Sequence, residues 1–399
     1  MKLANQLFQN KWKIPLNWDK IESYKLMEDA GFVTFPNSGI PLFPPIGKSI
    51  MEKISNIVRV AAENADFSEL YLPLVQNRSF LESTSRAEMF NNEFFQLSGN
   101  LENMIMSPTN EEIFLNHGKM GLESYKQLPI RTYQIAEKFR NIKKPKGILR
   151  SKQFLMCDMV SFDKDEKSLI KSAGLFEEIA QDVFKNLNIK PIRLSKNNEK
   201  YVDYVVPCKE GETDIEKNNG KFKYSTEKNS NSITSSSVGM YFIFEEIGNK
   251  NQNIYPTYVT ENNKISQVLL GTYGFGIQRC FHAAVVSQKD EYGINFSKNI
   301  RPFDVSILVI NPKEELQKLQ ADKIYNLLKE NKINTLYDNR DRKMLKEKAL
   351  LSDFYGIPKK IIIGKKESES NQYLIKKRGE MKGDLIDINQ ENIKAIIYG

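Results

Sequence analysis

The chain has 399 residues, of which 40% are hydrophobic and 27% charged, and this composition is typical of a folded globular protein. A chain of this length exceeds one ordinary hydrophobic core, so two or three domains are expected. The formal charge of +8 favours a polyanionic partner, although basic soluble proteins without such a partner are common.

The few cysteines and histidines disfavour several kinds of site. Cys157, Cys208 and Cys280 lie far apart without metal-ligand spacing and are expected to be thiols of a reducing compartment. His117 and His282 are the only histidines, which disfavours a zinc site and a Ser-His-Asp triad. No apolar run is long enough to cross a bilayer, so no membrane partner is expected. The first eighteen residues carry three lysines and no acid, a pattern that fits an organelle presequence or a domain edge equally.

The N-terminal three quarters of the chain combine helical patterns with short strand patterns. Residues 23–33 and 46–67 carry helical apolar spacing, and residues 68–75 are predicted to form a strand stopped by Pro73. Further strands without regularly interposed helices are predicted at 93–99, 103–108, 131–140, 152–162 and 267–276. This order predicts an α+β domain on an antiparallel sheet over residues 1–300.

A different pattern begins after Arg301-Pro302. Strands and helices alternate there, with strands predicted at 303–310, 333–338 and 359–364 and helices at 314–331 and 342–356. Strands separated by helices need crossover connections, so residues 301–399 are predicted to form a small α/β domain with mostly parallel pairing.

A cationic hairpin is predicted between residues 131 and 162. Both flanking segments alternate as strands, and Pro145 and Gly147 lie between them. Arg140 ends the first strand, and Arg150 and Lys152 open the second, so their cationic groups converge where they could bind phosphate oxygens. A solvated basic loop is the alternative on this segment alone.

Two further segments carry candidate binding residues. Gly271, Gly274 and Gly276 precede Arg279 and an apolar helical run, so the backbone could approach a ligand while the arginine reaches it. The alternative is a glycine-rich packing turn. Thr109 and Glu111, with a second acid after them, follow Pro108 in the pattern of a helix N-terminus.

The combination of these motifs closely resembles the prolyl-tRNA synthetases, a family of class II aminoacyl-tRNA synthetases. The resemblance rests on the order "PTNEE", "SYKQLPIRTYQIAEKFR", "GTYGFGIQR", "LYDNRD" and "GIPKKIIIGKK" and covers nearly the whole chain. It implies a class II catalytic domain followed by an anticodon-binding α/β domain. The implied reaction has two steps: ATP activates proline as prolyl-adenylate, and the prolyl group then passes to proline tRNA.

The resemblance also implies partners and site residues. ATP is the implied substrate with Mg²⁺, a homodimer is implied, no DNA partner is expected, no metal-ligating residue is assigned, and either the cytoplasm or the mitochondrial matrix is expected. Arg140 and Arg279 are the implied catalytic residues. The ATP-binding set is Arg140, Arg150, Lys152, Phe154, Gly276 and Arg279. The proline-binding set is Thr109, Glu111, Arg140, Thr272 and Gly274.

Several positions depart from the family pattern. Asn141 and Ile142 replace an acidic pair, and the segment that lines the family's proline pocket falls at residues 240–250 without its carboxylate and imidazole. Glu245 or Glu246 could replace that carboxylate only with a shift in register. The family's inserted editing domain has no room between residues 163 and 203. These departures leave open a second interpretation, a catalytically inactive or repurposed relative acting as a tRNA-binding or accessory subunit.

Overall fold

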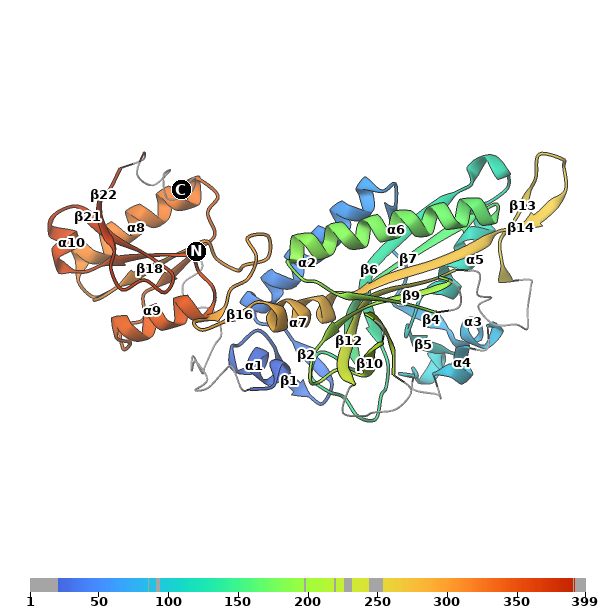
Figure 1. The fold of residues 1–399 in the computed structure, drawn as a ribbon, viewed down its shortest axis with the longest axis horizontal. Coiled ribbons are helices and arrows are strands. Elements are labelled where there is room, and N and C mark those ends of the chain that lie inside the picture. Colours follow the sequence, from blue (N-terminus) through green and yellow to red (C-terminus); the bar gives the residue numbers. More distant parts are fainter. Residues whose placement is uncertain are drawn as a thin grey trace. The chain divides into compact units, whose positions relative to one another are not determined.

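The computed structural model describes residues 21–84, 86–90, 94–196, 199–218, 220–225, 232–243, 254–389 and 391. They form two compact units, each of which appears in Figure 1. The first unit comprises the described residues of 1–34, 42–53 and 284–399, and the second those of 35–41 and 54–283. Glu245, Glu246 and the first eighteen residues lie outside the described part of the chain. The boundary at residue 301 stays a prediction.

A nine-stranded sheet is the framework of the second unit. Its pairings are antiparallel except for the short parallel contact of β3 with β6, which confirms the predicted α+β domain on an antiparallel sheet. The strands are β3 (Ser68–Glu69), β6 (Ile130–Phe139), β7 (Gln153–Asp163), β8 (Ile192–Lys196), β9 (Tyr201–Pro207), β10 (Thr213–Asn218), β11 (Lys221–Tyr224), β12 (Ile233–Ile243) and β15 (Leu269–Gly276).

The predicted hairpin is present as β6 and β7. The two strands pair in register from Ile130 with Phe162 to Phe139 with Gln153. On its other side β7 pairs with β15, so the glycine-rich segment runs beside the hairpin. Gly274 is required by this packing, because a Cβ there would lie 2.8 Å from the Cys157 carbonyl oxygen.

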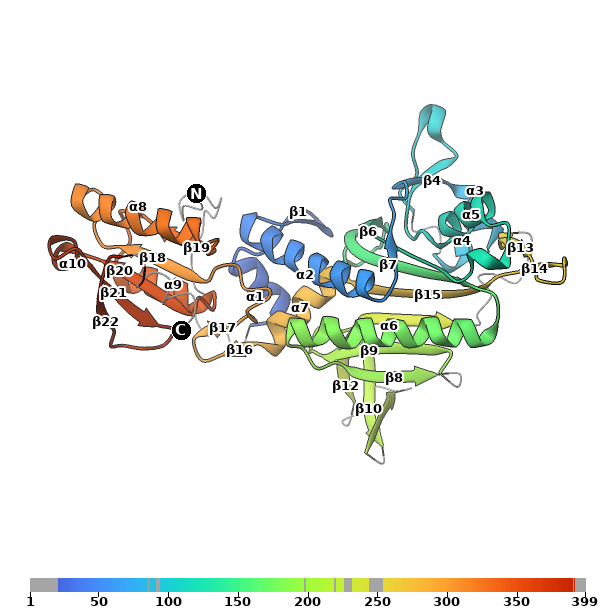
Figure 2. The same cartoon turned by 90° about the horizontal axis from the view of Figure 1, so that it is seen from above.

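The long helix α6 (Glu166–Leu187) has no counterpart among the elements predicted from sequence. It begins after Asp165, whose carboxylate accepts a hydrogen bond from the Ser168 amide, and it ends at Asn188 in the left-handed conformation (φ 53°). Figures 1 and 2 show it lying along one face of the sheet, where it contacts β7, β12 and β15.

Phe176 of α6 lies at the centre of an aromatic cluster. Its ring centroid is 5.1 Å from that of Phe275, 5.2 Å from Tyr273 and 5.9 Å from Tyr241, and the side chain is fully buried. We expect Phe176→Leu to lower the free energy of unfolding by about 1–2 kcal/mol, because the ring contacts are lost while most of the apolar volume stays. Urea unfolding followed by circular dichroism measures this, and an unchanged midpoint would contradict the assigned packing.

Further helices and strands lie before residue 288. Helices α3 (Arg78–Ser83) and α4 (Arg86–Met89) precede α5 (Glu111–Gly121), which begins at the predicted N-terminus after Asn110. The remaining elements in the middle of the chain are β1 (Thr34–Asn37), β2 (Ile40–Leu42), α2 (Pro45–Asn64), β4 (Val75–Asn77), β5 (Met104–Met106), β13 (Thr257–Val259), β14 (Ile265–Gln267) and α7 (Ile277–Ser287), with 3₁₀ turns at Gly99–Leu101 and Tyr125–Gln127.

Two strand predictions are wrong. Of residues 68–75 only the two residues of β3 and the first residue of β4 are extended in a sheet, since the chain leaves the edge of the sheet before Pro73, which has no N–H to pair. Among the described residues of 93–99, Gln96 makes one isolated bridge to Ile105 and no strand forms.

The C-terminal part of the first unit is a five-stranded sheet in the order β19-β18-β20-β21-β22. Figure 1 shows α8 and α9 on opposite faces of this sheet, which confirms a small α/β domain. The elements are β18 (Val305–Val309), α8 (Glu315–Glu330), β19 (Thr335–Asp338), α9 (Leu345–Phe354), β20 (Lys359–Ile363), α10 (Lys365–Glu369), β21 (Gln372–Lys377) and β22 (Asp384–Asp387).

The prediction of mostly parallel pairing in this domain is wrong for half of the sheet. β18 pairs in parallel with β19 and β20, but β20 with β21 and β21 with β22 are antiparallel. The five residues of α10 are too few for a crossover between parallel strands, so the chain returns beside β20 in the opposite direction.

Residues before 301 pack within the same unit. The Tyr355 hydroxyl donates to the Ala30 carbonyl at 2.7 Å, next to α1 (Ser23–Asp29). Arg378 pairs with Asp290 at 2.7 Å between Nη2 and Oδ1, in the hairpin of β16 (Lys289–Asp290) and β17 (Gly293–Ile294). No helix in the described part of the chain is both long and apolar enough to span a bilayer.

Candidate active site

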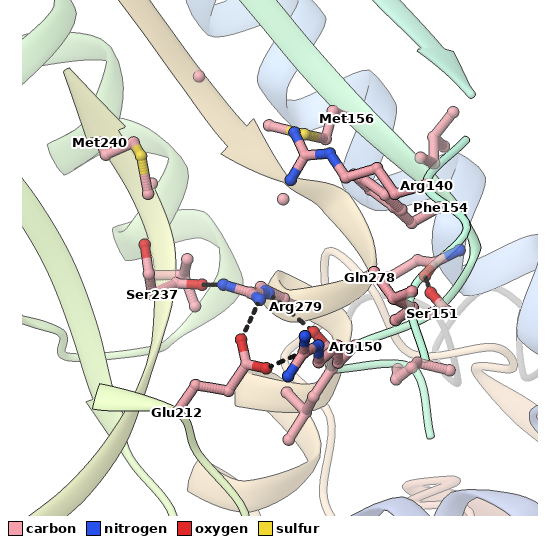
Figure 3. Close-up of a pocket in the computed structure, with 18 of the residues that line it drawn as sticks. Arg140, Arg150, Ser151, Phe154, Met156, Glu212, Ser237, Met240, Gln278 and Arg279 are labelled. Atoms are coloured by element: carbon pink, nitrogen blue, oxygen red, sulfur yellow. Dashed lines mark hydrogen bonds and ion pairs between the residues drawn. The ribbon is translucent and has the colours of Figure 1, made fainter. Parts of the chain in front are cut away.

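A cavity of about 520 Å³ lies in the second unit beside the β6–β7 hairpin. Its walls come from the hairpin, β12, β15 and the first turn of α7 (Figure 3). Three arginines line it, Arg140, Arg150 and Arg279, and of the described residues that line it Glu212 is the one carboxylate. The predicted convergence of cations at the hairpin is therefore present for its arginines.

Arg140 follows β6 directly and is held between two aromatic rings. Its guanidinium carbon lies 5.1 Å from the ring centroids of both Phe90 and Phe154, and its Nε donates to the Pro108 carbonyl at 3.1 Å. Burial lowers the pKa of Arg140 to about 10, although the carboxylate of Glu111 acts to raise it. The side chain therefore stays cationic at neutral pH in a partly desolvated site, where its charge acts strongly on an anion.

Arg279 and Arg150 approach the cavity from α7 and from the hairpin loop. Arg279 donates through Nε to the Leu149 carbonyl at 3.1 Å and through Nη1 to the Ser237 carbonyl at 3.5 Å. Its Nη2 lies 2.8 Å from Oε2 of Glu212, and Arg150 Nε lies 3.7 Å from Oε1 of the same carboxylate. Figure 3 shows the two arginines meeting at Glu212.

A second charged cluster surrounds the start of α5. Arg86 Nη2 lies 3.1 Å from Glu111 Oε1 and 3.4 Å from Thr109 Oγ1, and Arg86 Nε lies 3.6 Å from Glu112 Oε1. Burial acts to raise the pKa of Glu111, but the charge of Arg86 and the hydrogen bonds outweigh it and lower the pKa. For Glu112 burial prevails over Arg86, so its pKa is raised even though Thr84 donates to it at 2.7 Å.

A buried ion pair lies in the hairpin itself. Lys138 Nζ of β6 is 2.7 Å from Asp158 Oδ2 of β7, and the lysine side chain is fully buried. Burial raises the pKa of Asp158, although Lys138 opposes the shift. The electrostatic influences on Asp158 include Arg140 and Glu111, so the ion pair belongs to the same electrostatic surroundings as the arginine of the cavity.

The structure places the predicted site residues in two groups. Those that line the cavity are Arg140, Arg150, Phe154, Gly274, Gly276 and Arg279. Those outside its lining are Thr109, Glu111, Lys152 and Thr272. Thr109 and Glu111 lie instead in the Arg86 cluster, and Thr272 is buried on β15 opposite Val160 of β7.

Sequence reasoning missed Arg86 and Glu212. Arg86 lies 25 positions before its partner Glu111, and Glu212 lies 67 positions before Arg279, so no local spacing reveals either pair. Glu212 follows Gly211 in a segment to which the sequence assigns no motif. Met240, from the segment that departs from the family pattern, also lines the cavity.

The residues present do not fit a resident metal ion. In the described part of the chain no group of three or more His, Cys, Asp or Glu side chains is placed to hold one. Glu212 in the cavity is engaged by two arginines, and a divalent cation prefers free carboxylates and other oxygen ligands. The predicted Mg²⁺ is therefore assigned no protein ligand.

Comparisons with known families match both parts of the chain. Residues 94–288 match the tRNA synthetase class II core domain (G, H, P, S and T), and residues 304–397 match the anticodon binding domain. The chain therefore has a class II tRNA synthetase core domain followed by an anticodon binding domain. Curated proline–tRNA ligases match it over nearly its whole length, which confirms the resemblance to the prolyl-tRNA synthetases.

Two relatives illustrate the match. The proline–tRNA ligase of Rickettsia canadensis (strain McKiel) is 28% identical over 414 residues, covering 95% of this chain and 93% of the relative. That of Rickettsia bellii (strain OSU 85-389) is 26% identical over 413 residues, covering 95% of each.

Solved structures share the fold. The Giardia lamblia prolyl-tRNA synthetase in complex with prolyl-adenylate superposes with a TM-score of 0.73 at 17% identity, covering 93% of this chain and 74% of that one. The Cryptosporidium parvum prolyl-tRNA synthetase complexed with halofuginone and AMPPNP gives a TM-score of 0.73 at 17% identity, covering 94% and 75%.

Proposed function

We propose that this protein activates proline with ATP and transfers it to proline tRNA. The observation that carries the proposal is the cavity beside the antiparallel hairpin, in which three arginines and Phe154 converge. Curated relatives covering 95% of the chain are proline–tRNA ligases, and the similar solved structures hold prolyl-adenylate or AMPPNP.

In the first step a carboxylate oxygen of proline attacks the α-phosphorus of ATP, and the bond to the bridging oxygen breaks with its electron pair leaving on pyrophosphate. Charge develops on the phosphoryl oxygens during this attack, and fixed cations stabilise it without reorganising. In this proposal Arg140 binds the α-phosphate, and Arg150 and Arg279 bind the pyrophosphate part. No step requires a strong base, so the shortage of histidines is compatible with this chemistry.

Phe154 offers an aromatic face in the cavity for the adenine ring. The structure adds a second role for this residue, since its ring already packs against the Arg140 guanidinium. Gly276, which also lines the cavity, would let the backbone approach the nucleotide.

Proline recognition is assigned to the cluster at the start of α5. The carboxylate of Glu111 would face the secondary ammonium of proline, with Thr109, Thr272 and Gly274 completing the site. Arg86 is a positioning residue in this scheme, because it holds the Glu111 carboxylate in its ionised form. Magnesium would arrive on the phosphates of ATP as part of the substrate.

In the second step a hydroxyl oxygen of the terminal ribose of tRNA attacks the prolyl carbonyl carbon, the bond to AMP breaks with its electron pair leaving on the phosphate, and that phosphate accepts the hydroxyl proton. The tRNA is the partner expected for the anticodon binding domain at residues 304–397.

A homodimer is also proposed. Its interface would include Tyr71, which is 82% exposed beside Pro73. Light scattering measures the oligomeric state, and a monomer would contradict this proposal. Location in the cytoplasm or the mitochondrial matrix stays a prediction.

The test of this function is ATP–pyrophosphate exchange with magnesium, run with each of the twenty amino acids singly. We expect exchange with proline alone. Exchange with a different amino acid would show that the protein is specific for that substrate. The difference from the family would then be assigned to the segment that begins at Met240 and departs from the family pattern. No exchange by folded protein that binds tRNA would favour the accessory-subunit interpretation.

The C-terminal domain allows a separate prediction for tRNA binding. Lys365 and Lys366 directly follow the carboxyl end of β20 and are exposed, and ligands of α/β sheets bind outside the carboxyl ends of parallel strands. We expect the double alanine variant to bind proline tRNA more weakly, with the salt slope reduced by about 1–2 units. Exchange with proline stays at the wild-type rate, and unchanged tRNA affinity would contradict the placement.

A further inference from the structure

Glu212 places a negative charge among the arginines that the proposed function reserves for phosphates. Its carboxylate bridges Arg279, at 2.8 Å, and Arg150, at 3.7 Å. We propose that Glu212 is a built-in counterion, which the triphosphate of ATP displaces from both arginines and which pairs with them again when pyrophosphate leaves. This inference rests on the proposed function and concerns the same cavity.

The backbone around Glu212 is fixed. The Glu212 amide donates to the Ser235 carbonyl at 3.0 Å, and the Cys208 amide donates to the Thr234 carbonyl at 2.9 Å. A Cβ on Gly211 would lie 2.0 Å from the Ser235 carbonyl oxygen, so the loop lies directly against β12. The backbone of Glu212 therefore stays in place, and displacement of the carboxylate from the arginines needs only a rotation of the side chain.

The ion pairs of Glu212 are weak enough to exchange. The exposed fractions of the side chains are 37% for Glu212, 29% for Arg279 and 45% for Arg150. Ion pairs at this exposure lose much of their strength to solvent screening. Each changes the equilibrium constant between the paired and the separated side chains by about fivefold or less. A polyphosphate brings several negative charges and more acceptor oxygens to the same guanidinium groups, so it competes successfully with one carboxylate.

The counterion acts on one side of the cavity. Arg140 packs between Phe90 and Phe154, and Glu212 pairs with the other two cavity arginines. A ligand that needs only Arg140 should not sense Glu212. The charge of Glu212 therefore opposes the binding of ATP and pyrophosphate but not that of AMP. Because Glu212 competes with pyrophosphate for the two arginines, it speeds pyrophosphate release after adenylate formation.

The experiment is calorimetric titration of the full-length protein with pyrophosphate, ATP and AMP, each with and without magnesium. We expect Glu212→Gln to bind pyrophosphate and ATP about two- to fivefold more tightly, because the competing charge is gone, with AMP binding unchanged. The matched control is Glu82→Gln, which removes one charge from the exposed Arg78–Glu82 pair outside the cavity and should bind all three ligands like the wild type.

Several outcomes would overturn the proposal. Equal or weaker pyrophosphate binding by Glu212→Gln would show that Glu212 orients the arginines instead of competing for them. Weaker binding confined to the magnesium titrations would make it a metal ligand. If Glu212→Gln does not fold, Glu212→Asp is compared with the wild type, and we expect affinities within about twofold because the charge stays; a larger change contradicts the counterion role.

The proposed function and this inference fail differently. Wild-type protein that binds neither ATP nor pyrophosphate would refute both. Wild-type protein that binds ATP and performs exchange, with Glu212→Gln unchanged in pyrophosphate affinity, would refute the counterion alone.

Discussion

Arg140→Ala is expected to lower proline-dependent ATP–pyrophosphate exchange by about a thousandfold, the effect of removing a fixed charge from a developing anion. Arg140 is held in the cavity by two aromatic rings and the Pro108 carbonyl, so its charge is fixed in position before the substrate binds. Burial already disfavours its charge, and removing that charge offsets the lost packing. The melting temperature should therefore change little.

Two variants separate charge from geometry at this position. Arg140→Lys keeps a cation without the planar fork and should recover only part of the exchange rate. Arg193→Ala removes an arginine from exposed ion pairs with Glu177 and Glu199, outside the cavity, and should leave exchange unchanged. Wild-type exchange by Arg140→Ala would show that the adenylate forms elsewhere.

Arg86→Ala is expected to lower the free energy of unfolding by about 3–5 kcal/mol at neutral pH, because it leaves two buried carboxylates without their cation. Glu111 and Glu112 are 7% and 4% exposed, and Arg86 lies between them. The variant should also lose proline-dependent exchange, since Glu111 becomes protonated or moves. Chemical unfolding and exchange assays measure the two effects.

The pH dependence of this loss has a definite sign. In the wild type the pKa of Glu111 is lowered below 4.5, so its contribution to stability is present above the unfolded pKa and is lost as pH falls through the folded one. Without Arg86 burial raises the pKa of both carboxyls, and the folded state then takes up protons more readily than the unfolded chain. The deficit of Arg86→Ala should therefore shrink as pH falls from 7 toward 5, and a deficit independent of pH would contradict this account.

Matched variants make the result specific. Arg86→Lys keeps the charge and should recover much of the stability. Arg78→Ala removes an arginine from an exposed pair in the adjacent helix, where both side chains are more than 40% exposed, and should change the free energy of unfolding by less than about 1 kcal/mol.

The sequence determined the β6–β7 hairpin and the arginines at its end. Approximate alternation of polar and apolar residues along both segments, with Pro145 and Gly147 between them, is a local pattern and can be recognised without knowing any distant partner. The strand–helix alternation of the C-terminal domain was equally local. The antiparallel return of β21 was not, because it depends on the shortness of α10 and on which edge of β20 was free.

The long helix α6 has a local pattern that was not used to predict it. Buried apolar residues recur along it at helical spacing, among them Leu169, Phe176 and Val183, but the segment contains no catalytic motif. Its packing on β7, β12 and β15 follows from the sheet order, which joins strands more than 100 residues apart in the chain.

The candidate site also combines residues that a local sequence pattern reveals with contacts that only the fold creates. Arg140, Phe154, Gly274 and Arg279 lie in local motifs whose roles the resemblance to the family implies. The ion pairs of Arg86 with Glu111 and of Glu212 with Arg279 join segments 25 and 67 residues apart. Their strength depends on burial and on the distance between charges, which the sequence does not contain. The sequence by itself therefore determined which groups are proposed to carry the reaction, and the tertiary structure decided which counter-charges hold them, since only folding brings those charges within contact.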